Sequence, residues 1–279
     1  MGDIADRDLD FTGTAPCRPA NRHRSYSEGS SMIHKDLQRA LDPVEFSRYI
    51  GIEPDEWQAD VLHYEGKRLL LNCCRQSGKS TTTAVKALHT GIYRPKSLIL
   101  LVSPSLRQSQ ELFRKVKDGY MAMDARPALL EDNKLSMVMG NGSRIVSLPS
   151  DQATVRGFSG VTMILEDESS QVKDEFYYAI LPMLIINNGV FIAMTTPYGK
   201  RGHFFNEWVD GGADWKRVEI PAVQCPRISP AELEKQRRSL GSMFFRQEFC
   251  CEFVETVDQV FNYDMVQAAF DESVKPLFL

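Results

Sequence analysis

The sequence predicts an α/β fold with a central, mostly parallel β-sheet flanked by helices. Three observations predict it. Apolar, strand-like runs alternate with helical stretches along most of the chain, a Gly-Lys-Ser motif follows one of these runs, and an Asp-Glu pair ends another. Strands separated by helices pair in parallel and are covered on both faces, so this alternation indicates a layered α/β domain.

Composition is that of an ordinary globular protein. The 279 residues are enough for one large α/β domain or two small ones, and 43% are apolar and 25% charged. The net charge of −4 gives no overall positive field, so a nucleic-acid partner would have to meet a local basic patch.

Cysteine usage and hydropathy exclude several classes. The six cysteines include two adjacent pairs and no Cys-x-x-Cys, which argues against a zinc site or a disulfide framework. There is no signal peptide and no apolar run near about 18 residues. We therefore expect a reduced, cytosolic protein without a membrane partner.

The elements can be assigned in chain order. Residues 1–31 are polar and mixed in charge, which predicts a disordered leader. Two short helices divided at Pro43 are expected within 36–49, and another begins at 54–56. Asn141-Gly142 between two alternating runs predicts a hairpin. Further strands are expected at 69–71, 97–102, 134–139, 143–148, 161–165, 189–194 and 215–220, and further helices at 81–88, 106–120, 174–184 and 230–240.

The Gly-Lys-Ser motif lies in residues 73–80, Cys-Cys-Arg-Gln-Ser-Gly-Lys-Ser, between a strand and a helix. In a P-loop, backbone N–H groups and the new helix N-terminus surround phosphates. Lys79 would reach the β- and γ-phosphates, and the Ser80 hydroxyl would ligate Mg²⁺. Cys73 stands where the first glycine of the motif is expected. The alternative is an ordinary βα turn that matches by chance.

The Asp-Glu pair follows the apolar run 161–165 and has the pattern of a Walker B motif. A strand neighbouring the P-loop strand would bring Asp167 to Mg²⁺ and Glu168 to the water that attacks the γ-phosphate. The alternative is a strand followed by an acidic helix N-terminus. The P-loop upstream favours the catalytic interpretation.

Weaker signals surround these two motifs. Arg156-Gly157 lies on a loop before the Walker B strand and is either an arginine finger or a solvated loop arginine. Gln58 carries an amide that can hydrogen-bond adenine, while its neighbour Trp57 is expected in the core. Thr195-Thr196-Pro197 ends a strand where hydroxyl groups can contact a γ-phosphate. For the basic loop 200–203 we favour a solvated turn over a phosphate contact.

Together these residues resemble the ATPase domain of phage terminase large subunits, the motors that package double-stranded DNA into proheads. The resemblance covers Met32 to about Phe253, and the order and spacing of the motifs carry it. A Walker A motif without its first glycine and with an early basic residue is itself a habit of this family. The matching segments are 42–46, Pro54-Asp55-Glu56-Trp57-Gln58, Arg75-Gln76-Ser77-Gly78-Lys79-Ser80, Arg156-Gly157, Asp167-Glu168, Thr195-Thr196-Pro197 and 247–253.

The resemblance implies a P-loop NTPase fold of the ASCE, RecA- and helicase-like type, with ATP and Mg²⁺ as ligands. It implies that Gln58 belongs to an adenine-recognising Q motif and that Arg156 acts on a neighbouring subunit's nucleotide. Thr195-Thr196-Pro197 would couple hydrolysis to motion. Glu166 departs from the family's usual apolar residue, which leaves open which carboxylate binds metal. The implied nucleotide-binding set is Gln58, Arg75, Gln76, Ser77, Gly78, Lys79, Ser80 and Thr81, with Ser80 and Asp167 on the metal.

Partners and domain limits follow from the same resemblance. It implies double-stranded DNA, a portal protein and a small terminase subunit as partners. It also implies that the protein is a homo-oligomeric ring when assembled and a monomer when isolated. The expected location is the cytoplasm of an infected host cell. We expect an ATPase domain at 32–253 and a linker at 254–279 toward a nuclease domain that the sequence does not include, so no nuclease activity is expected.

Two other functions stay open from the sequence alone. A helicase or repair translocase shares the same motifs but needs a second RecA-like domain. A nucleotide-binding scaffold that no longer hydrolyses would have no need of both Lys79 and Glu168. ATP turnover measured with and without linear duplex DNA separates the three.

Overall fold

The computed structural model describes residues 24–150, 155, 157–255, 265 and 269. The chain divides into two units, residues 1–38 and 39–279. Most of helix α1 (Arg24–Leu41) belongs to the first unit and begins inside the segment expected to be a disordered leader. Residues 1–23 lie outside the described part. Within that part, no helix combines the length and the apolar character needed to cross a membrane.

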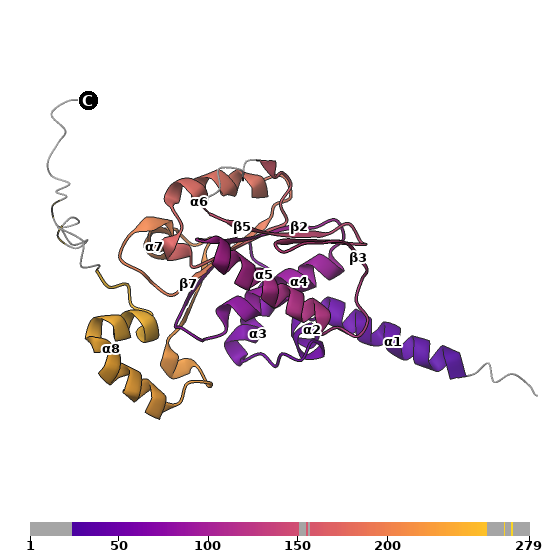
Figure 1. Ribbon diagram of the computed structural model, residues 1–279, viewed down its shortest axis with the longest axis horizontal. Coiled ribbons are helices and arrows are strands. Elements are labelled where there is room, and N and C mark those ends of the chain that lie inside the picture. The colour runs from indigo at the N-terminus through magenta and orange to yellow at the C-terminus, as the bar shows by residue number, and fades with distance from the viewer. Residues whose placement is uncertain (1–23, 151–154, 156, 256–264, 266–268, 270–279) are drawn as a thin grey trace, which may run out of the picture. The chain divides into compact units, whose positions relative to one another are not determined.

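An eight-stranded sheet forms the centre of the second unit (Figure 1). Its order is β3-β4-β5-β2-β6-β7-β1-β8, with all neighbours parallel from β5 to β8 and antiparallel pairing only at β3-β4 and β4-β5. The expectation of a mostly parallel sheet is therefore confirmed. The strands are β1 (Arg68–Cys73), β2 (Leu98–Ser103), β3 (Leu129–Asp132), β4 (Ser136–Met139), β5 (Arg144–Pro149), β6 (Met163–Asp167), β7 (Val190–Thr195) and β8 (Lys216–Ile220).

Helices cover both faces of this sheet, because successive side chains of each buried strand point to opposite sides. Leu69 and Leu71 of β1 pack into one apolar cluster, whereas Leu70 packs into the other. The first cluster lies under α2 (Pro43–Tyr49), α3 (Glu56–His63), α4 (Lys79–Tyr93) and α5 (Leu106–Met121). The second lies under α6 (Asp174–Ile180), the 3-10 turn η3 (Leu181–Leu184) and α7 (Gly202–Val209) (Figure 1).

The helix starts follow local capping chemistry. Asp42 accepts the Val44 N–H at 2.8 Å and precedes Pro43, so one helix ends and the next begins there, as the sequence predicts. Asp55 and Gln58 form a capping box at the start of α3. Ser229 caps α8 (Pro230–Cys250) by accepting the Glu232 N–H at 3.2 Å.

Several elements differ from the sequence-based prediction. Strand β3 and helix α7 were not predicted. The helix expected at 174–184 ends at Ile180 and continues as a 3-10 turn that contains Pro182. Helix α8 extends well beyond Leu240, through a kink at Gly241 (φ 72°, ψ 161°). The kink ends the local helical geometry where the prediction stopped, and the chain then resumes a helix up to Cys250.

Candidate functional site: a P-loop beside an acidic strand end

The P-loop leaves β1 at Cys73 and turns into α4 at Lys79. Gln76 and Gly78 both adopt positive φ, at 60° and 94°. The left-handed backbone favours glycine at Gly78, and a Cβ there would lie 2.5 Å from Gln58 Nε2, so the Gln58 amide would have to shift. Cys73 is fully buried under the loop and occupies the position of the missing glycine without a positive φ.

The other loop residues predicted to bind nucleotide surround this turn. Arg75 and Gln76 are exposed, and Ser77 is buried. Thr81 lies in the first turn of α4, where its N–H donates to Gly78 O at 3.0 Å. The first turn of a helix carries a partial positive charge, so the loop presents a site suited to an anion.

Three strand ends meet at the loop. The sheet order β6-β7-β1 puts the Thr195-Thr196 end of β7 between the P-loop and the Asp-Glu pair. The expectation that the Asp-Glu strand directly neighbours the P-loop strand is wrong, since β7 intervenes. Carboxyl ends of parallel strands share one edge, so all three sets of polar side chains still converge.

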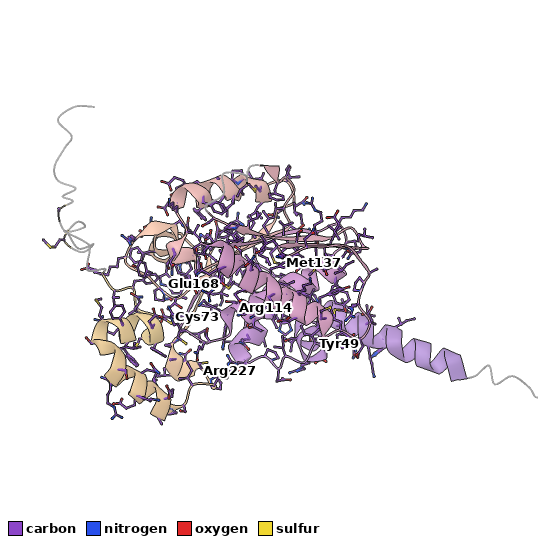
Figure 2. The ribbon with its side chains drawn as sticks, in the orientation of Figure 1. Tyr49, Cys73, Arg114, Met137, Glu168 and Arg227 are labelled. Carbon is purple, nitrogen blue, oxygen red and sulfur yellow. The ribbon has the colours of Figure 1, made fainter. Side chains whose placement is uncertain are left out.

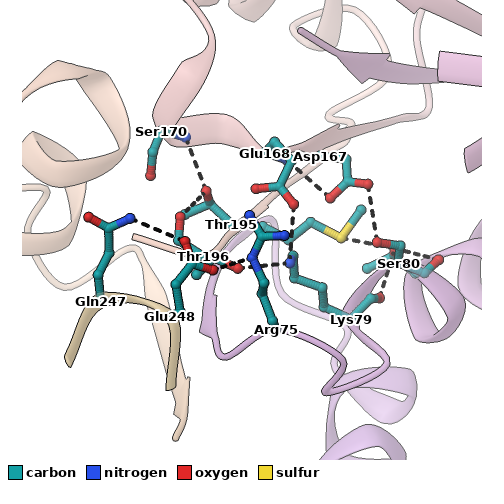
Figure 3. Close-up of polar contacts among 12 residues, drawn as sticks. Arg75, Lys79, Ser80, Asp167, Glu168, Ser170, Thr195, Thr196, Gln247 and Glu248 are labelled. Atoms are coloured by element: carbon teal, nitrogen blue, oxygen red, sulfur yellow. Dashed lines mark hydrogen bonds and ion pairs between the residues drawn. The ribbon is translucent and has the colours of Figure 1, made fainter. Parts of the chain in front are cut away.

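Direct contacts join the converging residues (Figure 3). Ser80 Oγ donates to Asp167 Oδ2 at 3.1 Å. Lys79 Nζ donates to Thr196 Oγ1 at 3.2 Å and lies 3.3 Å from Glu168 Oε1. A hydroxyl and a carboxylate held side by side are oxygen ligands of the kind that Mg²⁺ prefers. The donor set therefore fits a magnesium ion whose remaining ligands come from phosphates and water.

Burial and charge tune this cluster. Burial, followed by the nearby charge of Glu168, raises the pKa of Asp167 to about 6, while Lys79 opposes the shift. Burial alone would lower the pKa of Lys79, but Glu168 and Asp167 raise it above its usual value. Lys115 on α5 adds a second positive charge that acts on Asp167. Lys115 was not singled out from the sequence, because its approach depends on the packing of α5.

Glu168 has an unusual backbone conformation. Its φ of 50° and ψ of 45° lie in the left-handed region, which non-glycine residues occupy rarely. The Glu168 N–H donates to Asp167 Oδ1 at 3.0 Å. The 3-10 turn η2 (Ser169–Gln171) follows directly, and the Ser170 N–H donates to Thr195 Oγ1 at 3.4 Å. Thr196 thus contacts the P-loop lysine, and Thr195 contacts the turn after Glu168.

Gln58 braces the P-loop from α3. Its side chain accepts the Asp55 N–H at 2.9 Å and donates to Ser77 O at 3.3 Å. Both ends of the amide are therefore engaged with the protein backbone, and adenine recognition by Gln58 stays a prediction. Trp57 is partly buried against the core, as expected.

Two arginine contacts that the sequence did not reveal also hold the loop. Arg227, labelled in Figure 2, lies 2.7 Å from Asp55 Oδ2 and donates to Ser77 O. The Arg75 side chain forms an ion pair with Glu248 of α8, and the backbone N–H of Arg75 donates to the backbone carbonyl of Glu248 at 3.0 Å. A cavity of about 560 Å³ lies between the loop and α8. These contacts join segments far apart in the sequence, so no local pattern could indicate them.

Two other predicted residues lie elsewhere. Glu166 is fully buried and lies on the opposite side of β6 from Asp167, with its carboxylate 2.7 Å from His203 Nε2. Arg156 lies outside the described residues. In the basic loop, Lys200 Nζ is 3.9 Å from Glu255 Oε1. In the described part of the chain, no three His, Cys, Asp or Glu side chains are grouped to hold a metal by themselves.

Comparison with known proteins decides the family. Residues 70–268 match the family described as terminase large subunit, T4likevirus-type, N-terminal. The chain belongs to this family. The matched range contains the P-loop, the Asp-Glu pair and the Thr-Thr-Pro segment.

Individual terminases agree with this assignment. The terminase large subunit of Thermus virus P23-45 is 23% identical over 262 residues, which covers 81% of this chain and 54% of that protein. This terminase domain thus spans about half the length of the curated relatives it matches. The solved ATPase domain of the Thermus phage P74-26 large terminase superposes with a TM-score of 0.65 at 20% identity, over 75% of this chain and 98% of that one.

A third relative carries a nucleotide. The large terminase of the thermophilic bacteriophage D6E, solved in complex with ATP-γ-S, superposes with a TM-score of 0.56 at 10% identity. It covers 78% of this chain and 52% of that one. At such identities the superpositions establish the shared fold.

Proposed function

We propose that this terminase domain binds and hydrolyses ATP, and that it is the ATPase of a motor that translocates double-stranded DNA into a prohead. The observation that carries the proposal is the convergence of Lys79 and Ser80 with Asp167 and Glu168 at one sheet edge. Family membership supports it, and the D6E terminase in complex with ATP-γ-S supports nucleotide as the ligand.

Each residue has a role in hydrolysis. Lys79 and the N-terminus of α4 bind the β- and γ-phosphates. Ser80 and Asp167 hold Mg²⁺, which when bound neutralises charge on the phosphate oxygens. Glu168 accepts a proton from the water that attacks the γ-phosphate. Its carboxylate lies 3.3 Å from Lys79 Nζ, which keeps the base next to the group that binds the phosphate.

The remaining predicted residues support binding and coupling. Gln58 and Gly78 fix the shape of the P-loop, and Arg75, Gln76, Ser77 and Thr81 complete the nucleotide site. Thr196 contacts Lys79, and Thr195 contacts the turn after Glu168. Loss of the γ-phosphate would therefore change the contacts at the end of β7. Thr195-Thr196-Pro197 then transmits the change to α7.

The assembled motor extends beyond this chain. The partners are double-stranded DNA, a portal protein and a small terminase subunit, in the host cytoplasm, with the ATPase domain at 32–253 between a leader and a linker. Arg156 acts between subunits of a ring. If it does, mixing Arg156→Ala with Glu168→Ala subunits restores activity at interfaces that pair an intact finger with an intact base. A mixture that stays inactive argues for action within one subunit.

ATP turnover tests the proposal. The protein at excess over radiolabelled ATP should release phosphate in a Mg²⁺-dependent manner, slowly alone and faster with linear duplex DNA and on a portal. A helicase would also separate the strands of a tailed duplex, and a scaffold would bind ATP without turnover. Absence of any Mg²⁺-dependent phosphate release would contradict the proposal.

A further inference from the structure

A buried polar cluster lies directly behind the Asp-Glu pair, on the sheet face away from the P-loop. Glu166 of β6 is fully buried, and it points opposite to Asp167 because strand side chains alternate. Its Oε2 accepts a hydrogen bond from Ser169 Oγ and lies 2.7 Å from His203 Nε2 in the first turn of α7. Ser169 Oγ and His203 Nε2 are 3.0 Å apart, so the three groups form a closed triangle.

Carboxylates on two elements surround the His203 ring. Burial lowers the pKa of His203, but the carboxylates of Glu166 and Asp174 raise it by more. The pKa of His203 therefore lies above its usual value. Asp174, at the start of α6, lies 3.3 Å from His203 Nδ1. The same carboxylate accepts a hydrogen bond from the backbone N–H of His203 at 2.7 Å. On the remaining side the ring stacks on Tyr177, whose hydroxyl donates to Glu207 of α7 at 3.0 Å. Both ring nitrogens of His203 therefore lie next to carboxylates, Glu166 on β6 and Asp174 on α6.

This cluster holds the residue that follows Glu168. Glu168 adopts a left-handed conformation that the backbone does not favour, so its neighbours must fix it. Ser169 Oγ is held by Glu166 and His203, and the backbone N–H of Ser170 donates to Thr195 Oγ1. The turn that follows the Glu168 carboxylate is thus held at two successive residues, Ser169 and Ser170.

We propose that His203 and Ser169 are positioning residues for Glu168: with Glu166 they clamp the turn η2 so that the Glu168 carboxylate stays over the P-loop, and they tie that turn to α7. The inference rests on the proposed function, since it assigns roles relative to the hydrolytic carboxylate. None of the three residues faces the P-loop.

The clamp predicts a separation of chemistry from binding. Positioning matters most in the transition state, so loosening it lowers kcat while the phosphate contacts of Lys79 persist. Ser169→Ala removes one arm and leaves the Glu166–His203 pair in place, so this variant should fold. We expect kcat to fall at least about tenfold and KM for ATP to change by less than about twofold, since misplaced catalytic groups cost up to about 10²-fold. His203→Gln, which keeps a donor near Nε2 but loses the charge, should show a similar split.

Two matched controls isolate the clamp. Ser109→Ala deletes another fully buried serine hydroxyl, on α5, whose Oγ has no hydrogen-bond partner within the described residues. His63→Gln removes an exposed histidine that pairs with Asp42 at 2.9 Å. Both should hydrolyse ATP at the wild-type rate. Amide hydrogen exchange supplies a readout that needs no turnover: Ser169→Ala should speed exchange in a peptide spanning residues 166–172, and Ser109→Ala should not.

The outcomes are distinguishable. A wild-type kcat and unchanged exchange in Ser169→Ala overturn the clamp, as does a loss of kcat matched by an equal rise in KM. If the wild-type protein itself releases no phosphate, the proposed function fails, whereas the exchange experiment still tests the clamp. If Glu168→Gln abolishes turnover and Ser169→Ala does not slow it, the proposed function stands and this inference falls.

Discussion

Replacing Gly78 with alanine should open the P-loop and weaken nucleotide binding, because two separate costs meet at this residue. The backbone φ of 94° is left-handed, which costs a residue with a Cβ about 1–2 kcal/mol. The added methyl group would also lie 2.5 Å from Gln58 Nε2 and 3.2 Å from an Arg227 guanidinium nitrogen. Gln58 would have to move and give up two hydrogen bonds worth about 0.5–1.5 kcal/mol each. The expected loss of unfolding free energy is therefore about 2–5 kcal/mol.

Gly51→Ala is the matched control for this prediction. Its φ of 80° carries the same kind of backbone strain, but no atom lies within 4 Å of the added Cβ. Urea unfolding of both variants separates backbone strain from steric clash. Titration with a fluorescent ATP analogue measures the nucleotide affinity of the P-loop in each variant. We expect Gly51→Ala to lose about 1–2 kcal/mol with wild-type affinity, and Gly78→Ala to lose more and bind at least about tenfold more weakly. Equal destabilisation with unchanged nucleotide affinity would refute the reasoning.

Three further predictions concern charges around the site. Lys79→Ala should weaken ATP binding by about 10- to 100-fold in the same titration, since it removes a charged hydrogen-bond donor worth about 1.5–3 kcal/mol; wild-type affinity would contradict this. Arg227→Leu should lower the affinity several-fold, because Ser77 O and Asp55 lose their common donor; unchanged binding would show that the loop needs no such brace. His203→Gln should destabilise the fold more at pH 6 than at pH 9 in urea. The raised pKa of folded His203 makes its charge stabilising below about 6.5, and this contribution disappears as the pH rises through the folded pKa. A difference in unfolding free energy between wild type and His203→Gln that does not change with pH would contradict this prediction.

Local chemistry explains what the sequence could predict. The strands of the sheet centre are apolar on both faces, so runs such as Leu69–Leu71 stood out. Asp42, Asp55 and Ser229 begin helices through capping rules that act over a few residues. The P-loop and the Asp-Glu pair were found because motif spacing is fixed by the strand-turn-helix geometry that the nucleotide requires.

Contacts between distant segments explain what it could not. Glu166 and His203 lie 37 residues apart, so no local pattern could indicate their contact. Arg227 reaches Ser77 across 150 residues. Strand β3 was missed because it is a sheet edge with mostly exposed side chains and no buried face to impose alternation.

The central claim, that Glu168 is the hydrolytic base of an ATP site built on Lys79, is tested most directly by one variant. Glu168→Gln keeps the shape of the side chain and removes its ability to accept a proton at neutral pH. Single-turnover phosphate release and ATP-analogue binding should be measured on the same preparations of wild type and variant. We predict nucleotide affinity within about threefold of wild type and turnover at least about 10²-fold slower, which is the usual contribution of a general base. Turnover at the wild-type rate would contradict the account.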